Sequence, residues 1–242
     1  MMKALVVGGS NGIGLAIAMC LKEKGYDVHI IDKADPDTRA LGLAFERFDL
    51  TSDDYSIFDR HQDADVVMIT AGFGHLALFD DIDETSIQHY FQVNAIAAIR
   101  IVKHFYQKLL SENPFRLGVM VSIAGFMSSP FLSVYGATKA ALKVFIESVN
   151  VELEKAGSSN SILNVSPGSV KGTHFNGGQT NRMELVMPLA EDIVAHLLNG
   201  DDLFIPQYET VYRHVLERYH QDFRAEGRHS YDYKVQSGRM KR

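Results

Sequence analysis

Cysteine is almost missing from this sequence, which holds Cys20 and no second thiol among its 242 residues. One cysteine excludes an intramolecular disulfide framework and a cysteine-rich zinc site. Basic residues are also few, because 24 lysines and arginines stand against 30 aspartates and glutamates, for a formal charge of −6. Nucleic acids and anionic membrane surfaces attract clustered positive charge, so the composition argues against either as a partner.

Long hydrophobic runs are absent as well. No apolar stretch reaches the roughly 18–20 residues that a membrane span requires. The apolar run Ala4–Val7 ends at Gly8-Gly9 after four residues, which is too short for the apolar region of a secretory signal. We therefore expect a cytoplasmic protein.

The sequence also lacks internal repeats, low-complexity tracts and a linker rich in Pro, Gly or Ser, so residues 1–207 are expected to form one domain. Short β-branched runs predict buried strands at 4–7, 28–31, 66–69, 119–121, 162–165 and 203–205, with a weaker candidate at 44–48. Helical periodicity is found at 13–24, 85–110, 133–155 and 189–198. This alternation predicts an α/β fold: a three-layer, doubly wound parallel sheet (Rossmann fold) of about seven strands with helices on both faces.

A glycine-rich turn follows the first predicted strand and precedes the first predicted helix. The turn runs from Gly8 to Gly14, and the residues that we assign to a dinucleotide cofactor are Gly8, Ser10, Asn11, Gly12, Ile13 and Gly14. Gly8 permits the tight turn, Gly12 lets the backbone approach a pyrophosphate, and Gly14 allows close packing of helix and sheet. The helix N-terminus then offers free N–H groups to the phosphates. By itself such a motif is weak, since three glycines also build ordinary turns.

Asp32 closes the second predicted strand, 18 positions after Gly14. A carboxylate at that place accepts hydrogen bonds from the adenosine ribose and repels a 2′-phosphate, so NAD(H) is favoured over NADP(H). The alternatives are a solvated loop acid, or an acid that begins a turn at 32–35. Lys33 follows directly and keeps accommodation of a phosphate open.

Tyr135 and Lys139 lie one turn apart on one face of a predicted helix, and Ser122 ends the strand before it. A tyrosine has an ordinary pKa near 10, and an adjacent ammonium favours its phenolate form. Tyr135 is therefore a candidate acid/base for exchanging a proton with a substrate oxygen during hydride transfer. A lone Tyr-x-x-x-Lys pair is more often only a pair on a helix surface.

Over about residues 3–206 the sequence resembles the short-chain dehydrogenase/reductases in their single-domain form. The matching positions are the glycines with Ile13, then Asp49-Leu50, Ala71-Gly72, the tetrad Asn94, Ser122, Tyr135 and Lys139, and Pro167-Gly168 with Val170. The resemblance implies that Tyr135 is the acid/base, that Ser122 orients the reacting oxygen, and that Lys139 holds the nicotinamide ribose. It implies that Asn94 bends its helix and positions a water in a proton relay, although a polar residue there also fits a simple local kink.

The same resemblance assigns Asp49 and Leu50 to the adenine, and Pro167, Gly168 and Val170 to the nicotinamide. Ala71 and Gly72 are likewise assigned to cofactor binding. Three positions depart from the family pattern: Val7 replaces a threonine, Ile69-Thr70 replaces two asparagines, and the carboxamide threonine comes one residue late, as Thr173. We expect altered packing at Ile69-Thr70, because the family's asparagines tie strand to helix, and we keep Thr173 as the carboxamide contact.

The segment 172–188 resembles the family's substrate loop, and its apolar residues favour a partly hydrophobic substrate or else belong to the core. Phe73, His75, Phe126 and Met127 are further candidates for the same cleft. The ten histidines show no ligand spacing, so no metal site is indicated.

The segment 208–242 holds five of the ten tyrosines and eight basic against five acidic residues. Its apolar spacing predicts a helix from about 208 to 226, ended by Gly227 and followed by a looser tail. We expect this helix to cover the substrate mouth or a neighbouring subunit, or merely to close the sheet edge.

The sequence as a whole predicts an oxidoreductase that interconverts an alcohol and a ketone or aldehyde with NAD(H). The alternative is a regulator that senses redox state by binding NAD(P) without turnover. An epimerase or dehydratase of the extended branch would need a longer chain. Extra apolar surface over 94–110 and 134–153 predicts a homodimer or homotetramer.

Overall fold

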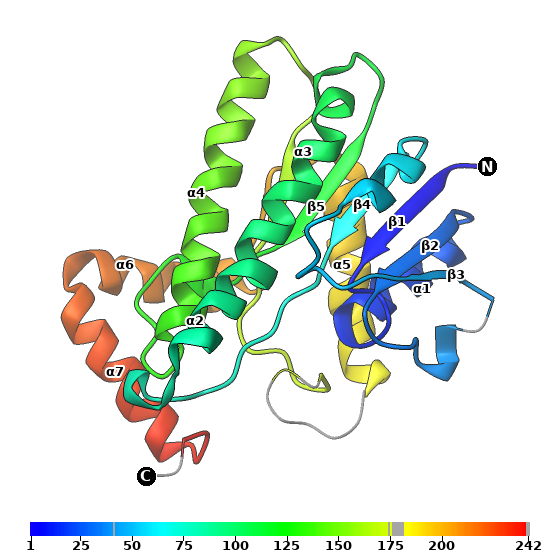
Figure 1. The fold of residues 1–242 in the computed structure, drawn as a ribbon. Coiled ribbons are helices and arrows are strands. Elements are labelled where there is room, and N and C mark those ends of the chain that lie inside the picture. The colour runs from blue at the N-terminus through cyan, green and yellow to red at the C-terminus, as the bar shows by residue number, and fades with distance from the viewer. Residues whose placement is uncertain (41, 174, 176–181, 241–242) are drawn as a thin grey trace.

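Figure 1 shows a computed structural model of the chain, which describes residues 1–40, 42–173, 175 and 182–240. Seven parallel strands form one sheet in the order β3-β2-β1-β4-β5-β6-β7. They are β1 (Lys3–Val7), β2 (Asp27–Asp32), β3 (Ala44–Arg47), β4 (Val66–Ile69), β5 (Arg116–Met120), β6 (Ile162–Val165) and β7 (Leu203–Phe204). The predicted doubly wound sheet is confirmed, and the weak strand candidate is its edge strand β3.

Helices cover both faces of this sheet (Figure 1). They are α1 (Gly12–Glu23), α2 (Glu84–Phe91), α3 (Ala97–Leu110), α4 (Ser133–Lys155), α5 (Met183–Asn199), α6 (Arg213–Gln221) and α7 (Phe223–Gln236). Shorter helical turns are η1 (Thr38–Ala40), η2 (Ser56–His61), η3 (Phe79–Asp81), η4 (Gln92–Ile96), η5 (Ile123–Gly125) and η7 (Tyr208–Tyr212). Helices α1 and α5 cover one face, and α3 and α4 cover the other.

The strands are apolar along their whole length because both of their faces are buried. In β1, Val7 packs in the core beneath α3 and α4, while its neighbour Val6 packs in the core beneath α1 and α5. Successive side chains of a strand point to opposite faces, so one run of apolar residues serves both cores. The sheet is thereby fixed between its helical layers, with the carboxyl ends of its strands at a common edge.

The helix α5 begins at Met183, six residues before the predicted start at Leu189. The part of the expected substrate loop from 183 to 188 is therefore helical, and Pro188 lies inside the helix. Met183 and Val186 are buried against α1 and the sheet, so core packing outweighs the proline. Residues 174 and 176–181 of the expected loop lie outside the described part of the chain.

The C-terminal extension, residues 208–240 of the described chain, differs from its prediction. It forms two helices, and the break falls at Asp222, whose carboxylate caps α7 by accepting from the amides of Arg224 and Ala225. Gly227 does not stop a helix. It lies within α7, where a β-carbon would come 3.0 Å from the Ser128 hydroxyl, so the glycine allows close packing on that loop. Figure 1 shows α6 and α7 beside the start of α4.

The outer surface of α3 and α4 is partly apolar, as predicted, although much of the predicted apolar surface is core. Ile101 and Phe105 are fully buried beneath the helices, whereas Val144 and Val151 remain 61% and 54% exposed. Among the described helices, none combines enough length with enough apolar character to span a lipid bilayer.

Candidate active site

A cavity of about 930 Å³ opens along the carboxyl ends of the central strands. Its wall runs from the glycine turn after β1, past the ends of β2, β4 and β5, to the first turns of α4 and then to α6 and α7. In doubly wound sheets ligands collect at this edge, where the strand order reverses between β1 and β4. Of the predicted catalytic and cofactor residues, all but Ser10 and Asn94 line the cavity.

The glycine turn has the geometry that its sequence predicts. Gly8 and Gly12 have φ values of +85° and +55°, which residues with a side chain rarely adopt. A β-carbon on Gly14 would overlap the carbonyl oxygen of Gly8, so the turn and α1 approach each other closely. The Asn11 side chain makes no capping hydrogen bond, and the first amides of α1 stay available to an anionic ligand.

Ser10 supports this turn from beneath. It is fully buried, its hydroxyl donates to the Ala34 carbonyl at 2.9 Å, and its amide donates to the Asp32 carboxylate at 3.0 Å. The second Asp32 oxygen accepts from the Ala34 amide at 3.2 Å. Asp32 thus holds the turn and also borders the cavity beside Lys33, and its contact with a ribose stays a prediction.

Thr70 ties β4 to the glycine turn. Its hydroxyl lies 3.0 Å from the carbonyl oxygens of both Val7 and Gly8. A β-carbon on Gly8 would come 2.5 Å from the Ala71 amide nitrogen, which shows how closely the two segments pack. A threonine at this departure from the family pattern therefore still joins the strand to the turn.

Asp49 and Leu50 follow β3 and line the adjoining part of the cavity. The Asp49 carboxylate accepts from the amide and hydroxyl of Thr51 at 2.9 and 2.8 Å, and these bonds lower the pKa of Asp49. The Leu50 carbonyl accepts from the buried Tyr55 hydroxyl at 2.7 Å. The pair is held rigidly at the predicted adenine position.

Three members of the predicted tetrad converge on the cavity from two elements. Ser122 follows β5, and its hydroxyl accepts from the Ala124 amide at 3.1 Å. Tyr135 and Lys139 extend from the first turns of α4, and the Lys139 ammonium donates to the Met120 carbonyl at 2.8 Å. All three side chains are buried.

Asn94 lies beneath them, in the π-helical turn η4 between α2 and α3. Its side-chain amide forms two hydrogen bonds with the Phe73 backbone, accepting from the amide at 2.9 Å and donating to the carbonyl at 2.8 Å. A β-carbon on Gly72 would come 3.3 Å from the Asn94 carboxamide oxygen and 3.4 Å from the Lys139 nitrogen. The glycine therefore keeps open a space that both polar groups face.

Burial controls the ionisation of the two central groups. It raises the pKa of Tyr135 to about 12, helped by Tyr90 and opposed by a hydrogen bond with Ser122. It lowers the pKa of Lys139 to about 7. In the free chain burial thus acts against the expected phenolate, because removing a charged group from water is costly. At neutral pH Tyr135 is a phenol, which suits it to donate a proton.

The loop after β6 carries the predicted nicotinamide residues. Pro167, Gly168 and Val170 line the cavity. Thr173 is nearly buried, with its hydroxyl 3.4 Å from the Val170 carbonyl and its methyl group 3.8 Å from a β-carbon built on Gly12. Thr173 therefore lies close to the glycine turn, at the edge of the cavity.

The end of the cavity next to Tyr135 has apolar side chains on one wall. Phe175 packs against Tyr135 with ring centroids 5.1 Å apart, and Phe73 and Met127 also line the space. The two other cleft candidates do not line the cavity: the His75 ring is bonded to the Tyr90 hydroxyl at 2.9 Å, and Phe126 lies beneath Lys143.

The opposite wall comes from the C-terminal extension, whose individual residues were not assigned from the sequence. Its lining residues are Val211, Tyr212, Val215, Arg218, Glu226, His229, Ser230, Tyr233, Lys234 and Arg239. Lys234 donates to the Ser129 hydroxyl at 2.9 Å and to the Pro130 carbonyl at 2.8 Å, and burial lowers its pKa to about 8. The sequence signals for this wall were its tyrosines, its basic charge and its apolar spacing, and they left the docking place open between the substrate mouth, a neighbouring subunit and the sheet edge.

Comparison with known proteins agrees with this arrangement. A family profile described as short chain dehydrogenase matches residues 2–184, which leaves the extension outside the match. Dehydrogenase RED2 of Cochliobolus heterostrophus is 29% identical over 160 residues, which is 62% of this chain and 60% of the relative. The probable short-chain type dehydrogenase/reductase VdlC of Helicobacter pylori is 28% identical over 178 residues, or 69% and 65%. The matches therefore span less than two thirds of either relative's length.

Among solved structures, an alcohol dehydrogenase from the archaeon Thermococcus sibiricus, complexed with 5-hydroxy-NADP, has a TM-score of 0.71 at 21% identity. The likeness covers 85% of this chain and 96% of that one. At this level of identity the likeness supports the fold.

Proposed function

The chain belongs to the short-chain dehydrogenase/reductase family, and from this premise we propose that it is an oxidoreductase that interconverts a secondary alcohol and a ketone, or an aldehyde, with a nicotinamide dinucleotide. The observation that carries the proposal is the convergence of Ser122, Tyr135 and Lys139 on a cavity whose other end is the glycine turn. One continuous space thus joins a place for pyrophosphate to a place for proton transfer.

The residues present fit such a cofactor. Gly8 and Gly12 adopt backbone conformations that keep side chains out of the turn, and the start of α1 is free to hold phosphate oxygens. Asp32 would meet the adenosine ribose, the pair Asp49-Leu50 the adenine, and Pro167–Val170 the nicotinamide end. When bound, the cofactor supplies or accepts the hydride.

Tyr135 would donate a proton to the carbonyl oxygen in the reducing direction, with Ser122 hydrogen-bonded to the same oxygen. Lys139, whose pKa of about 7 lets it change protonation near neutrality, would help to restore that proton. Asn94 would hold the Phe73 backbone through its two hydrogen bonds. Across the space beside Gly72 it would also position the far end of a proton relay that runs through Lys139.

The walls favour a substrate with an apolar body, which would lie against Phe73, Met127 and Phe175. On the far side, Arg218 is neutralised by Glu226 at 2.8 Å, whereas within the described chain Lys234 donates to two neutral oxygens, the Ser129 hydroxyl and the Pro130 carbonyl. We propose that Lys234 attracts a polar or anionic end of the substrate. NAD(H) is the proposed preference over NADP(H), because Asp32 borders the ribose position.

We also propose a homodimer or homotetramer that buries the apolar outer surface of α3 and α4. A groove of about 490 Å³ runs between these helices and is lined by Ile99, Tyr106, Phe145 and Val149 among others.

The cytoplasm is the proposed location, where a buried single thiol such as Cys20 stays reduced.

The decisive experiment follows the absorbance of the reduced nicotinamide with a panel of ketones, aldehydes and alcohols. Tyr135→Phe should lower kcat by about 10²–10⁴-fold while dinucleotide binding persists. Tyr26→Phe, which removes a hydroxyl just before β2 and outside the cavity and the groove, is the matched control and should be fully active. Full activity of Tyr135→Phe would overturn the mechanism, and tight dinucleotide binding without turnover of any substrate would favour the regulator instead.

A further inference from the structure

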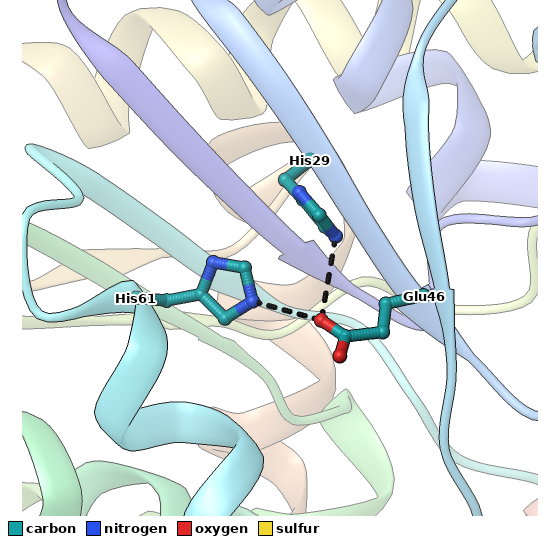
Figure 2. Close-up of side chains that lie close together, drawn as sticks. All are labelled: His29, Glu46 and His61. Carbon is teal, nitrogen blue, oxygen red and sulfur yellow. Dashed lines mark hydrogen bonds and ion pairs between the residues drawn. The ribbon is translucent and has the colours of Figure 1, made fainter.

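Two histidines and a glutamate meet at the edge of the sheet, outside the cavity described above. His29 comes from β2, Glu46 from the edge strand β3, and His61 from the end of η2 (Figure 2). Glu46 pairs in register with Ile31, two residues from His29, so both side chains extend from the same face of the sheet. The turn η2 covers that face and adds the third group.

The three side chains point at one another. The Glu46 carboxylate oxygen Oε2 lies 3.3 Å from Nε2 of His61 and 3.7 Å from Nε2 of His29. The candidate ligand atoms all lie within 4.8 Å of one another. A cation bound at about 2.0–2.2 Å from imidazole nitrogen and carboxylate oxygen holds its ligand atoms roughly 3–3.5 Å apart, so small side-chain rotations suffice.

The second observation is a ring nitrogen of His29 that lacks a hydrogen-bond partner among the described residues. Its Nε2 atom is shielded from solvent and has no hydrogen-bond partner within the described residues. Buried polar atoms without partners are rare and costly, and the atom faces the carboxylate that His61 also faces. Burial, together with the neighbouring His61, lowers the pKa of His29, so its ring carries a lone pair at neutral pH.

Glu46 has its other oxygen in an ion pair with Arg60. Burial alone would raise the pKa of Glu46, but hydrogen bonds from Arg60 and His61 and their charges lower it, so the carboxylate is charged. The cluster is also within reach of solvent, because the side chains of His29, Glu46 and His61 are 31%, 29% and 13% exposed. A cation can therefore enter and keep a fourth position for water.

We propose that His29, Glu46 and His61 form a binding site for a divalent transition-metal ion, with Zn²⁺ as its first candidate. Two imidazoles and one carboxylate are a donor set that suits zinc and its neighbours in the transition series, and one that Mg²⁺ and Ca²⁺ disfavour. The ion would tie β3 and η2 to β2. The proposal stands independently of the oxidoreductase activity, because His29, Glu46 and His61 are not among the residues that line the cavity.

A bound ion would matter most for β3. This strand has four residues and lies at the end of the sheet beside β2, so among the described residues its far edge is unpaired. The three ligands are separated by 17 and 15 positions along the chain, and joining them restricts two long loops. Zn²⁺ should therefore raise the thermal midpoint of the metal-free protein, and a chelator should reverse the rise.

The test is calorimetric titration of ZnCl₂ into the metal-free full chain. We expect one site in the wild type and binding at least tenfold weaker in His61→Asn and in Glu46→Gln. His214→Asn is the matched control, because His214 is exposed on α6 and pairs with Glu217 at 3.4 Å. It should bind as the wild type does. Equal affinity in wild type and ligand variants, or no binding to the wild type, would overturn the proposal.

Arg60→Gln separates a metal site from a simple ion-pair network. Removing the guanidinium frees a carboxylate oxygen and takes a positive charge away from the incoming cation, so Zn²⁺ binding should tighten several-fold. Unchanged or weaker binding would count against the site. Should the ligand variants fail to fold, the imidazole resonances of the wild type give the answer. At one equivalent of Zn²⁺ only His29 and His61 should shift, and shifts elsewhere alone would refute the assignment.

Discussion

Tyr212 occupies the space that a side chain at Gly168 would need. A β-carbon built on Gly168 would overlap the Tyr212 hydroxyl oxygen, so the tyrosine reaches from η7 to the backbone of the loop after β6. The C-terminal extension thereby touches the loop that the family resemblance assigns to the nicotinamide. We take this contact as the physical link between the extension and the proposed cofactor site.

Gly168→Ala should therefore destabilise the protein through Tyr212. Forcing a methyl group into a packed contact costs about 1–3 kcal/mol in the free energy of unfolding. In a Tyr212→Ala background the same change should cost much less, because the overlap is gone. Urea denaturation of the four proteins of this double-mutant cycle measures the coupling, and additive effects of the two changes would show that the contact is not made.

Stability should rise with pH between pH 7 and 9 because of Lys139. Its pKa is about 7 in the folded chain against 10.5 for the ordinary side chain. Between these two values the unfolded state binds one proton more than the folded state. The loss of folding stability that results is complete below pH 7 and disappears toward pH 10.5. Lys234, with a pKa of about 8, acts in the same direction.

The expected slope is about 1.4 kcal/mol per pH unit for a fully buried group such as Lys139. Above pH 9 the rise should become shallower, because burial raises the pKa of Cys20 from 9.0 to about 11, and there the folded state holds a thiol proton that the unfolded state has lost. Urea unfolding at pH 7, 8 and 9 should show a flatter profile for Lys139→Met than for the wild type. Lys155→Met, exposed at the end of the same helix, should keep the wild-type profile, and an equally steep rise in Lys139→Met would contradict the assignment.

Asp32→Ala should change which dinucleotide binds. The carboxylate stands at the end of β2 and would repel a 2′-phosphate, so its loss should tighten NADP(H) binding at least tenfold. NAD(H) should bind more weakly, because the amides of Ser10 and Ala34 lose their acceptor. Calorimetry with both cofactors measures the change, and Asp35→Ala, from the exposed Asp35–Arg47 pair, is the control. NADP(H) binding equal to or tighter than NAD(H) in the wild type would mean that Lys33 governs the pocket.

Lys234→Met should loosen the extension from the body of the protein. The ammonium joins α7 to Ser129 and Pro130, next to Phe131, whose ring stacks on Tyr231 with centroids 4.5 Å apart. Leaving these acceptors without a donor costs about 1–3 kcal/mol.

We expect a lower thermal midpoint and a higher KM for substrates with an anionic end. Arg224→Met, an exposed change on the same helix, should alter neither.

Truncation after Gln207 should impair turnover or assembly, and a fully active truncated protein would limit the extension to closing the sheet edge.

A charge on the outer surface of α4 should reduce the size of the assembly. Val144 and Val151 are exposed valines on that helix, and an aspartate in place of either would have to be buried in the proposed interface. Light scattering after gel filtration should then show a smaller species than the wild type. Leu185→Asp, on α5 at the opposite face of the sheet, is the control. An unchanged mass for both valine variants would remove α4 from the interface.

The sequence by itself determined the strand and helix order, the glycine turn and the positions of Ser122, Tyr135 and Lys139. These features are local: a β-branched run forms a strand, a glycine meets a positive φ, and two residues four apart share a helix face. The seven-stranded sheet followed because short strands alternate with helices. Boundaries were less secure where packing overrode local preference, as at Met183, and where a side chain such as Asp222 capped a new helix.

Only the tertiary structure decided what depends on contacts between distant residues. It placed Tyr212 against Gly168 and Lys234 against Pro130, and it brought His29, Glu46 and His61 together although no spacing in the sequence relates them. It also set the ionisation of Tyr135 and Lys139, since burial, and not their four-residue separation, controls their pKa values. Docking and desolvation arise from the packing of the whole chain, so no local pattern reveals them.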